Sequence, residues 1–269
     1  MRTQNAPVIR LKDYTPPAYL IDAVDLDVAL DATNTIVKTR LMVRRPSYTK
    51  AGTALILDGN ELTLISLAVN GEQLSTADYQ TDEDSLTIQT PPMSRTFVVD
   101  IETSVAPENN TKLMGLYRSN GVFCTQCEAE GFRRITYFPD RPDVLSVYTV
   151  RLEADRENCP RLLSNGNPVE SGDLDGNRHF ATWHDPYPKP CYLFALVGGD
   201  LDVLTDAFTT ATGKSVDLNI YVEKGKADMA SFAMDALKRS MVWDEREYGL
   251  EYDLDVFNIV AVSDFNMGA

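Results

Sequence analysis

The stretch VDLDVALDATNTIVKTRLMV, residues 24–43, decides the fold class. In residues 24–30 and again in residues 37–43, apolar side chains or threonine stand at every second position, which is the period of a half-buried β-strand. The DATN segment between the two runs has the composition of a turn. Residues 24–43 therefore predict a β-hairpin that pairs an acidic strand with a basic strand. The charged residues are Asp25 and Asp27 on the first strand and Lys38 and Arg40 on the second.

Short strands of the same kind are expected through most of the first 200 residues. Residue pairs typical of tight turns, Asp58-Gly59 and Asn70-Gly71, separate some of them. Regular short strands with turns between them are typical of an antiparallel sandwich. The sequence therefore predicts a mostly β fold that begins with a β-sandwich domain over residues 1–200. The further strands are expected at residues 54–57, 62–69, 85–88, 97–101, 147–154, 161–163, 180–183 and 192–197.

The pattern changes after residue 200. A strand is expected at residues 216–222, a helix at 227–247 and another strand at 254–262. This order predicts the opening part of a mixed α/β domain over residues 201–269. Because one helix gives such a domain little core of its own, we expect the chain to be a fragment of a longer protein. The apolar face of the helix is predicted to consist of Phe232, Ala233, Ala236, Leu237, Ser240 and Met241.

Composition excludes several classes of partner. Asp and Glu number 40 against 25 Lys and Arg, a net charge of −15, which disfavours nucleic acid and anionic membrane surfaces. Nowhere do the roughly 18 consecutive apolar residues of a transmembrane helix occur, and the polar N-terminus lacks the apolar core of a signal peptide. The four cysteines are ordinary usage for 269 residues and favour reduced thiols. We therefore expect a cytoplasmic protein without nucleic-acid or membrane partners.

The histidines and cysteines give weak signals of chemistry. His179 and His184 are the only histidines and stand five residues apart in a strand-like segment, so they are expected on opposite faces, as structural or surface residues. A zinc site needs several converging ligands. Cys124 and Cys127 form a C-x-x-C pair without a second pair nearby, so redox or metal chemistry there is disfavoured.

The segment TQCEAEGFRR, residues 125–134, carries a more informative pattern. In an extended conformation Gln126, Glu128 and Glu130 share one face. Three such groups could receive an ammonium ion, a donor with three protons. The alternative is a solvated strand edge whose carboxylates pair with Arg133 and Arg134. The residues alone leave both interpretations open.

Four segments taken together resemble the bacterial aminopeptidase N family. They are TQCEAEG at residues 125–131, YFPDRPD at 137–143, PYPKPCYLFALV at 186–197 and NMGA at 266–269, the last of which is similar to the start of the family's Gly-Ala-Met-Glu-Asn motif. The resemblance runs from about residue 10 to the end of the chain. It implies a β-sandwich or saddle domain followed by a thermolysin-like α/β catalytic domain. Residues 201–269 would be the opening strand–helix–strand part of the latter.

The resemblance also implies an activity and a set of binding residues. The whole protein would be a zinc-dependent aminopeptidase acting on peptides with a free N-terminal amine. Its single zinc ion would be bound by residues beyond the C-terminus of this chain. The chain would then contain no catalytic residue and no metal ligand, and would be inactive alone; we expect a monomer. Glu128 would bind the substrate amine and Gln126 and Met267 would line the first side-chain pocket, while Gly268 and Ala269 would offer backbone groups to the substrate.

Two alternatives are open. A non-catalytic β-sandwich binding module, which would meet basic partners with its acidic surface, assigns no special role to Glu128. An epoxide-hydrolysing branch of the same family tends to carry Gln at this position, so that Glu128 favours the aminopeptidase.

Overall fold

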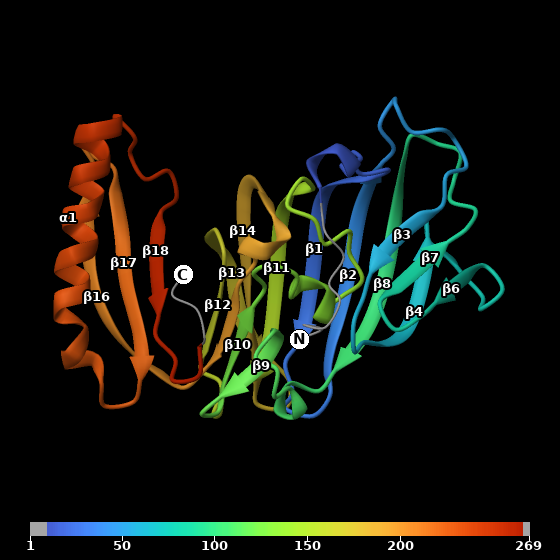
Figure 1. Cartoon of the computed structure of the whole chain (residues 1–269). Coiled ribbons are helices and arrows are strands. Elements are labelled where there is room, and N and C mark those ends of the chain that lie inside the picture. The colour runs from blue at the N-terminus through green and yellow to red at the C-terminus, as the bar shows by residue number, and fades with distance from the viewer. Residues whose placement is uncertain (1–9, 266–269) are drawn as a thin grey trace.

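The hairpin of residues 24–43 lies at the centre of a large sheet (Figure 1). In the computed structural model, which describes residues 10–265, β1 (Leu20–Ala29) and β2 (Thr35–Arg44) pair antiparallel with Asp25 opposite Arg40. The predicted hairpin is therefore confirmed. The eight strands lie in the order β13 (Asn167–Leu174), β14 (Arg178–Pro190), β11 (Leu145–Asp155), β1, β2, β8 (Thr96–Val105), β4 (Thr63–Val69) and β5 (Glu72–Gln73).

One pairing in this sheet departs from the expected antiparallel arrangement. β1 runs parallel to β11, with Val24 opposite Tyr148 and Val28 opposite Leu152. The two strands are far apart in the sequence, and a parallel pair requires a long crossover connection. A purely antiparallel sandwich is therefore wrong, while the mostly β fold class is confirmed.

Two smaller sheets complete the β core. Val24 and Leu41 of the large sheet, Leu57 and Leu86 of one small sheet and Phe123 of the other belong to a single cluster of buried apolar residues. The core thus lies between the large sheet and the two small ones. The small sheets are β3 (Leu55–Asp58), β7 (Ser85–Ile88) and β6 (Tyr79–Thr81), and β12 (Arg161–Ser164), β15 (Leu196–Gly199), β10 (Val122–Gln126) and β9 (Gly115–Ser119). Short 3₁₀ helices are η1 (Leu11–Asp13), η2 (Pro107–Asn109), η3 (Phe132–Arg134) and η4 (Cys191–Leu193).

Several strands escaped the sequence prediction. β10 is buried at every position and β13 is largely polar, so neither alternates with a period of two. The strand expected at residues 192–197 is wrong in its first half. The chain forms η4 there, and β15 begins only at Leu196.

The C-terminal part forms a separate three-stranded sheet. Its order is β16 (Leu201–Thr209), β17 (Ser215–Glu223) and β18 (Val256–Val260), with β18 parallel to β17. After the 3₁₀ turn η5 (Ala227–Ala230), helix α1 (Ser231–Tyr248) runs along β16 and β17 (Figure 1). The predicted strand–helix–strand order is confirmed.

The face that α1 buries agrees only in part with the predicted one, which contained Leu237 and Met241 but not Met234. Met234, Leu237 and Met241 are buried against the sheet, whereas the side chain of Phe232 is 76% exposed. Phe232 stands five residues before Leu237, which places the two about 140° apart around an α-helix at 3.6 residues per turn. Phe232 therefore faces away from the stripe that contains Met234, Leu237 and Met241.

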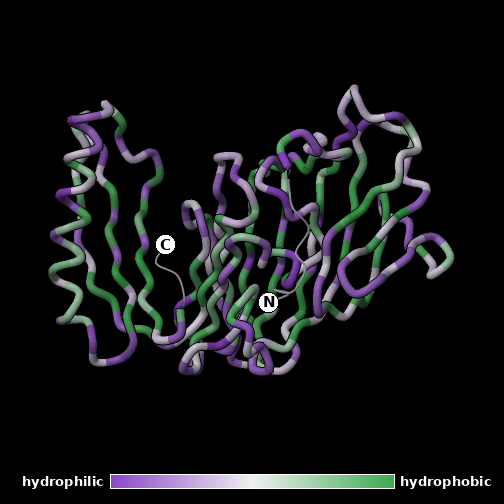
Figure 2. Tube along the Cα trace, in the orientation of Figure 1, coloured by the Kyte–Doolittle hydropathy of each residue, from purple (hydrophilic) through white to green (hydrophobic). Residues whose placement is uncertain are grey.

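A third apolar cluster joins the two parts of the chain. It brings Val122, Leu163 and Trp183 together with Leu201 and Tyr221. Figure 2 shows hydrophobic residues concentrated along the strands and hydrophilic ones in the loops.

The division into domains at residue 200 stays a prediction. Within residues 10–265, no helix is both long and apolar enough to cross a bilayer.

Candidate functional site

The candidate site is the turn at the end of β10. Gly131 donates its backbone N–H to the carbonyl of Cys127 (2.8 Å), so the chain turns directly after Gln126. The expectation that Gln126, Glu128 and Glu130 share one extended face is therefore wrong. Glu128 and Glu130 are exposed on the turn, and Gln126 is buried at 4% exposure.

Gln126 holds the turn from inside. Its side-chain Nε2 donates to the backbone carbonyl of Glu128 at 3.0 Å. The peptide bond between Glu128 and Ala129 is cis. Within residues 10–265, the carboxylate of Glu128 takes part in no hydrogen bond and no ion pair. The turn therefore exposes a carboxylate to which none of the described residues is bound.

The last residue of the turn has to be glycine. A Cβ atom at Gly131 would lie 2.3 Å from the backbone oxygen of Gln126 and 2.8 Å from the Cα of Cys127. Both neighbours are backbone atoms and cannot move aside without deforming the turn. Close packing of Gly131 thus fixes the path of the chain on both sides of Glu128.

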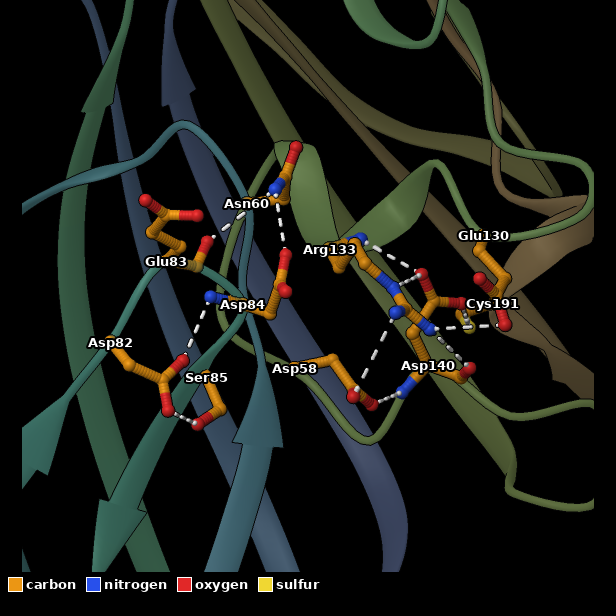
Figure 3. A network of polar contacts seen from close by, with 10 residues as sticks. All are labelled: Asp58, Asn60, Asp82, Glu83, Asp84, Ser85, Glu130, Arg133, Asp140 and Cys191. Carbon is orange, nitrogen blue, oxygen red and sulfur yellow. Dashed lines mark hydrogen bonds and ion pairs between the residues drawn. The ribbon is translucent and has the colours of Figure 1, made fainter. Parts of the chain in front are cut away.

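A buried ion pair braces the turn from the other side (Figure 3). The backbone N–H and the Nε of Arg133 both donate to Oδ2 of Asp140, at 3.1 and 3.0 Å, and the Asp140 side chain is 1% exposed. Arg133 also pairs with Glu130 at 3.4 Å. Cys191 donates its thiol to Oδ1 of Asp140 at 3.0 Å. The solvated-edge interpretation is thus right for Glu130, while Glu128 is left unpaired.

A second carboxylate completes this network. Oδ2 of Asp58 accepts the backbone N–H of Asp140 at 2.9 Å, and its Oδ1 lies 3.8 Å from Arg133. Burial raises the pKa of the Asp58 carboxyl, and the nearby Arg133 guanidinium opposes that rise. Asp140 lies in the YFPDRPD segment, which indicated the family. Nothing in that segment predicted that Asp140 would bind Arg133 and so stabilise the turn.

Three further predicted binding residues follow β18 in the sequence. Met267, Gly268 and Ala269 lie outside the described residues. The closest described segment is the one that ends at Phe265, which follows β18.

The described residues do not fit a zinc site. No group of three or more His, Cys, Asp or Glu side chains that could hold a metal occurs in residues 10–265. The ring of His179 is hydrogen-bonded to the carbonyl of Cys159 at 2.7 Å, and that of His184 to the hydroxyl of Thr149 at 3.0 Å. Both histidines therefore have structural partners, as predicted. Cys124 and Cys127 are free and buried thiols.

Known proteins similar to this chain are found by family and by sequence. Residues 16–193 match the Peptidase M1 N-terminal domain. The chain is 54% identical over 269 residues to Aminopeptidase N of Caulobacter vibrioides, and 49% identical over 257 residues to Aminopeptidase N of Escherichia coli. It covers 31% and 29% of these proteins, so it spans about a third of the length of the curated relatives it matches.

Solved structures give the same result. Legionella pneumophila aminopeptidase A, in complex with aspartic acid, superposes with a TM-score of 0.91 at 35% identity, over 97% of this chain and 30% of that one. An M1 zinc metallopeptidase of Deinococcus radiodurans, with a TM-score of 0.74 at 15% identity over 90% of this chain and 56% of that chain, shares the fold. With its β core, its Glu128 turn and a family match over residues 16–193, this chain belongs to the M1 peptidase family.

Proposed function

We propose that this chain is the N-terminal part of a zinc-dependent aminopeptidase that removes single N-terminal residues from peptides. The observation that carries the proposal is the free carboxylate of Glu128, held outward on a turn that Gln126 and the Arg133–Asp140 pair brace from within. The names of the relatives support it, because the relatives from Caulobacter vibrioides and Escherichia coli are each called Aminopeptidase N.

The proposed chemistry of Glu128 is recognition of an ammonium group. A peptide with a free N-terminus carries one positive charge with three N–H donors, and an unpaired carboxylate accepts such donors in charge-assisted hydrogen bonds. Each such bond contributes about 1.5–3 kcal/mol. Gln126, bonded to the backbone of Glu128, is proposed to line the pocket for the first side chain. Met267, Gly268 and Ala269 keep the binding roles expected from the sequence.

The cofactor and the setting are proposed as well. Since residues 10–265 offer no fitting ligands, the zinc ion would be held by the part of the longer relatives that this chain does not span. We propose a monomeric, cytoplasmic protein whose partners are peptides rather than nucleic acid or membrane. The four free thiols support a reducing compartment.

The test replaces Glu128 by Gln in the full-length protein. Loss of one charge-assisted contact should lower kcat/KM on an amino-acid p-nitroanilide by about 10- to 100-fold, because 1.4 kcal/mol corresponds to a factor of ten. Zinc content and melting temperature should not change, since the Glu128 carboxylate has no partner among residues 10–265.

Glu130→Gln is the matched control, because it removes the same charge from the same exposed turn two residues away. It should keep kcat/KM within about threefold of the wild type. Equal activity of Glu128→Gln and the wild type would refute the role of Glu128. A full-length protein that cleaves no aminoacyl substrate would instead favour the non-catalytic binding module.

A further inference from the structure

Two arginines directly follow the turn that carries Glu128. Arg133 and Arg134 lie on η3, and Arg133 reaches the exposed Glu130 on the turn with an N–O distance of 3.4 Å. A guanidinium group therefore comes within reach of the turn. Within residues 10–265, however, neither arginine forms an ion pair with Glu128. Both are bound to carboxylates outside the turn instead.

Arg133 is held by two such carboxylates (Figure 3). Its Nε lies 3.0 Å from Oδ2 of Asp140, and its Nη1 lies 3.8 Å from Oδ1 of Asp58. Its Nη2 also donates to the backbone carbonyl of Asp140 at 3.2 Å. Hydrogen bonds between charged groups are stronger than those between neutral ones. Loss of the exposed Glu130 would therefore leave Arg133 in place.

Arg134 is held by the segment that follows β3. Its Nη2 pairs with Oε2 of Glu61, its Nη1 donates to Oδ1 of Asn60, and its Nε donates to the carbonyl of Met114 at 3.2 Å. Glu61 is the one carboxylate within residues 10–265 with which Arg134 forms an ion pair. A hydrogen bond from Lys112, together with Arg134, holds the pKa of the Glu61 carboxyl below its usual range. Glu61 is therefore ionised at neutral pH.

Residues 58–61 are called the arginine-binding segment, because they supply carboxylates to both arginines. The segment is fixed against the chain around η3. The backbone N–H of Asn60 donates to the carbonyl of Arg133 at 3.0 Å. A Cβ atom at Gly59 would lie 2.2 Å from the ring of Tyr137, so the backbone of the segment lies directly on that ring.

An arginine bound to Glu128 would neutralise its carboxylate and occupy the oxygens that an ammonium group needs, because a guanidinium binds a carboxylate through two parallel hydrogen bonds. We propose that the arginine-binding segment is a specificity determinant: it holds both arginines away from Glu128, whose carboxylate stays available to the ammonium group of a peptide. Asp58 and Glu61 act through the arginines and are therefore positioning residues. The inference rests on the proposed aminopeptidase function.

The test begins with Glu61→Gln in the full-length enzyme, since this change removes the carboxylate of Arg134. KM for an amino-acid p-nitroanilide should rise about fivefold, the upper end for an exposed charge pair, while kcat stays within about twofold. Adding Arg134→Gln removes the released cation, so the double variant should return to within about twofold of the wild-type KM. Adding Arg134→Lys instead keeps the cation, and KM should stay raised.

The matched control is Asp206→Asn, which releases Lys238 from an exposed ion pair of 2.6 Å in the small α/β unit and should leave KM unchanged. The proposal is refuted if the wild type is active and Glu61→Gln has the same KM as Asp206→Asn. It is also refuted if Arg134→Gln fails to lower the KM of Glu61→Gln, because structural damage accumulates instead of cancelling. A wild type without aminopeptidase activity would instead refute the proposed function on which the inference depends.

Discussion

Burial sets the chemistry of the four cysteine residues. Each thiol is buried and free. Desolvation raises the pKa of Cys124 to about 11 and that of Cys159 to about 12. It also raises the pKa of Cys127 and Cys191, and the adjacent Asp140 carboxylate adds to the rise at both. The C-x-x-C pair is therefore a pair of core residues, and its thiolates are disfavoured.

This predicts slow thiol chemistry in the folded chain. The thiolate is the reactive form, and a pKa near 11 instead of 9 reduces its population at pH 8 about 100-fold. Native protein should therefore react slowly with a disulfide reagent, and faster as the pH rises, whereas all four thiols should react at once in denaturant. An added cysteine at the exposed Ser75 should react rapidly in the folded state. Fast reaction of a native thiol in the unmodified protein would contradict the buried assignment.

At the scale of elements, helix α1 is held by one stripe of its surface. Met234, Leu237 and Met241 pack against Val216, Leu218 and Ile220 of β17, and Gly249 ends the helix with a φ of 65°. Burial against the sheet contributes most of the stability of such a helix, because isolated helices of this length are marginal.

Leu237→Ala should therefore lower the free energy of unfolding by about 2–4 kcal/mol. The control is Phe232→Ala on the exposed face, for which the expected change is within about 0.5 kcal/mol. Urea unfolding followed by circular dichroism and tryptophan fluorescence measures both. If Phe232→Ala proves the more damaging substitution, Phe232 lies on the buried side of α1, contrary to the structure.

At the scale of the whole molecule, the chain forms a β core and a small α/β unit joined by apolar packing. Trp183 and Val197 on one side meet Leu201 and Val256 on the other. This packing places the Glu128 turn and the segment after β18 in one body. A zinc ion has no fitting ligand set within residues 10–265 of that body.

The isolated 269-residue chain is therefore expected to bind no stoichiometric zinc. Equilibrium dialysis followed by elemental analysis measures the metal, with the full-length protein as the positive control at one zinc per chain. Circular dichroism confirms that the isolated chain is folded during the measurement. Tight, stoichiometric zinc on the folded chain would overturn the proposal that the metal is held by the part of the relatives that this chain does not span.

Local patterns determined much of this protein. The period of two in residues 24–43 predicted the hairpin, and the strand–helix–strand order after residue 200 was correct. These features depend on the spacing of apolar residues and on residues that are neighbours in the sequence, so that they can be predicted from the sequence alone.

Only the tertiary structure decided the rest. The parallel pairing of β1 with β11, the bracing of the turn by Arg133 and Asp140, and the attachment of Asp264 to β9 all join segments that are distant in sequence. Their energies come from burial and from hydrogen bonds between such segments, and local sequence patterns do not encode which distant partners meet. The turn at Gly131 shows the consequence: the segment predicted to be extended turns back at that glycine, and the turn exposes the carboxylate of Glu128.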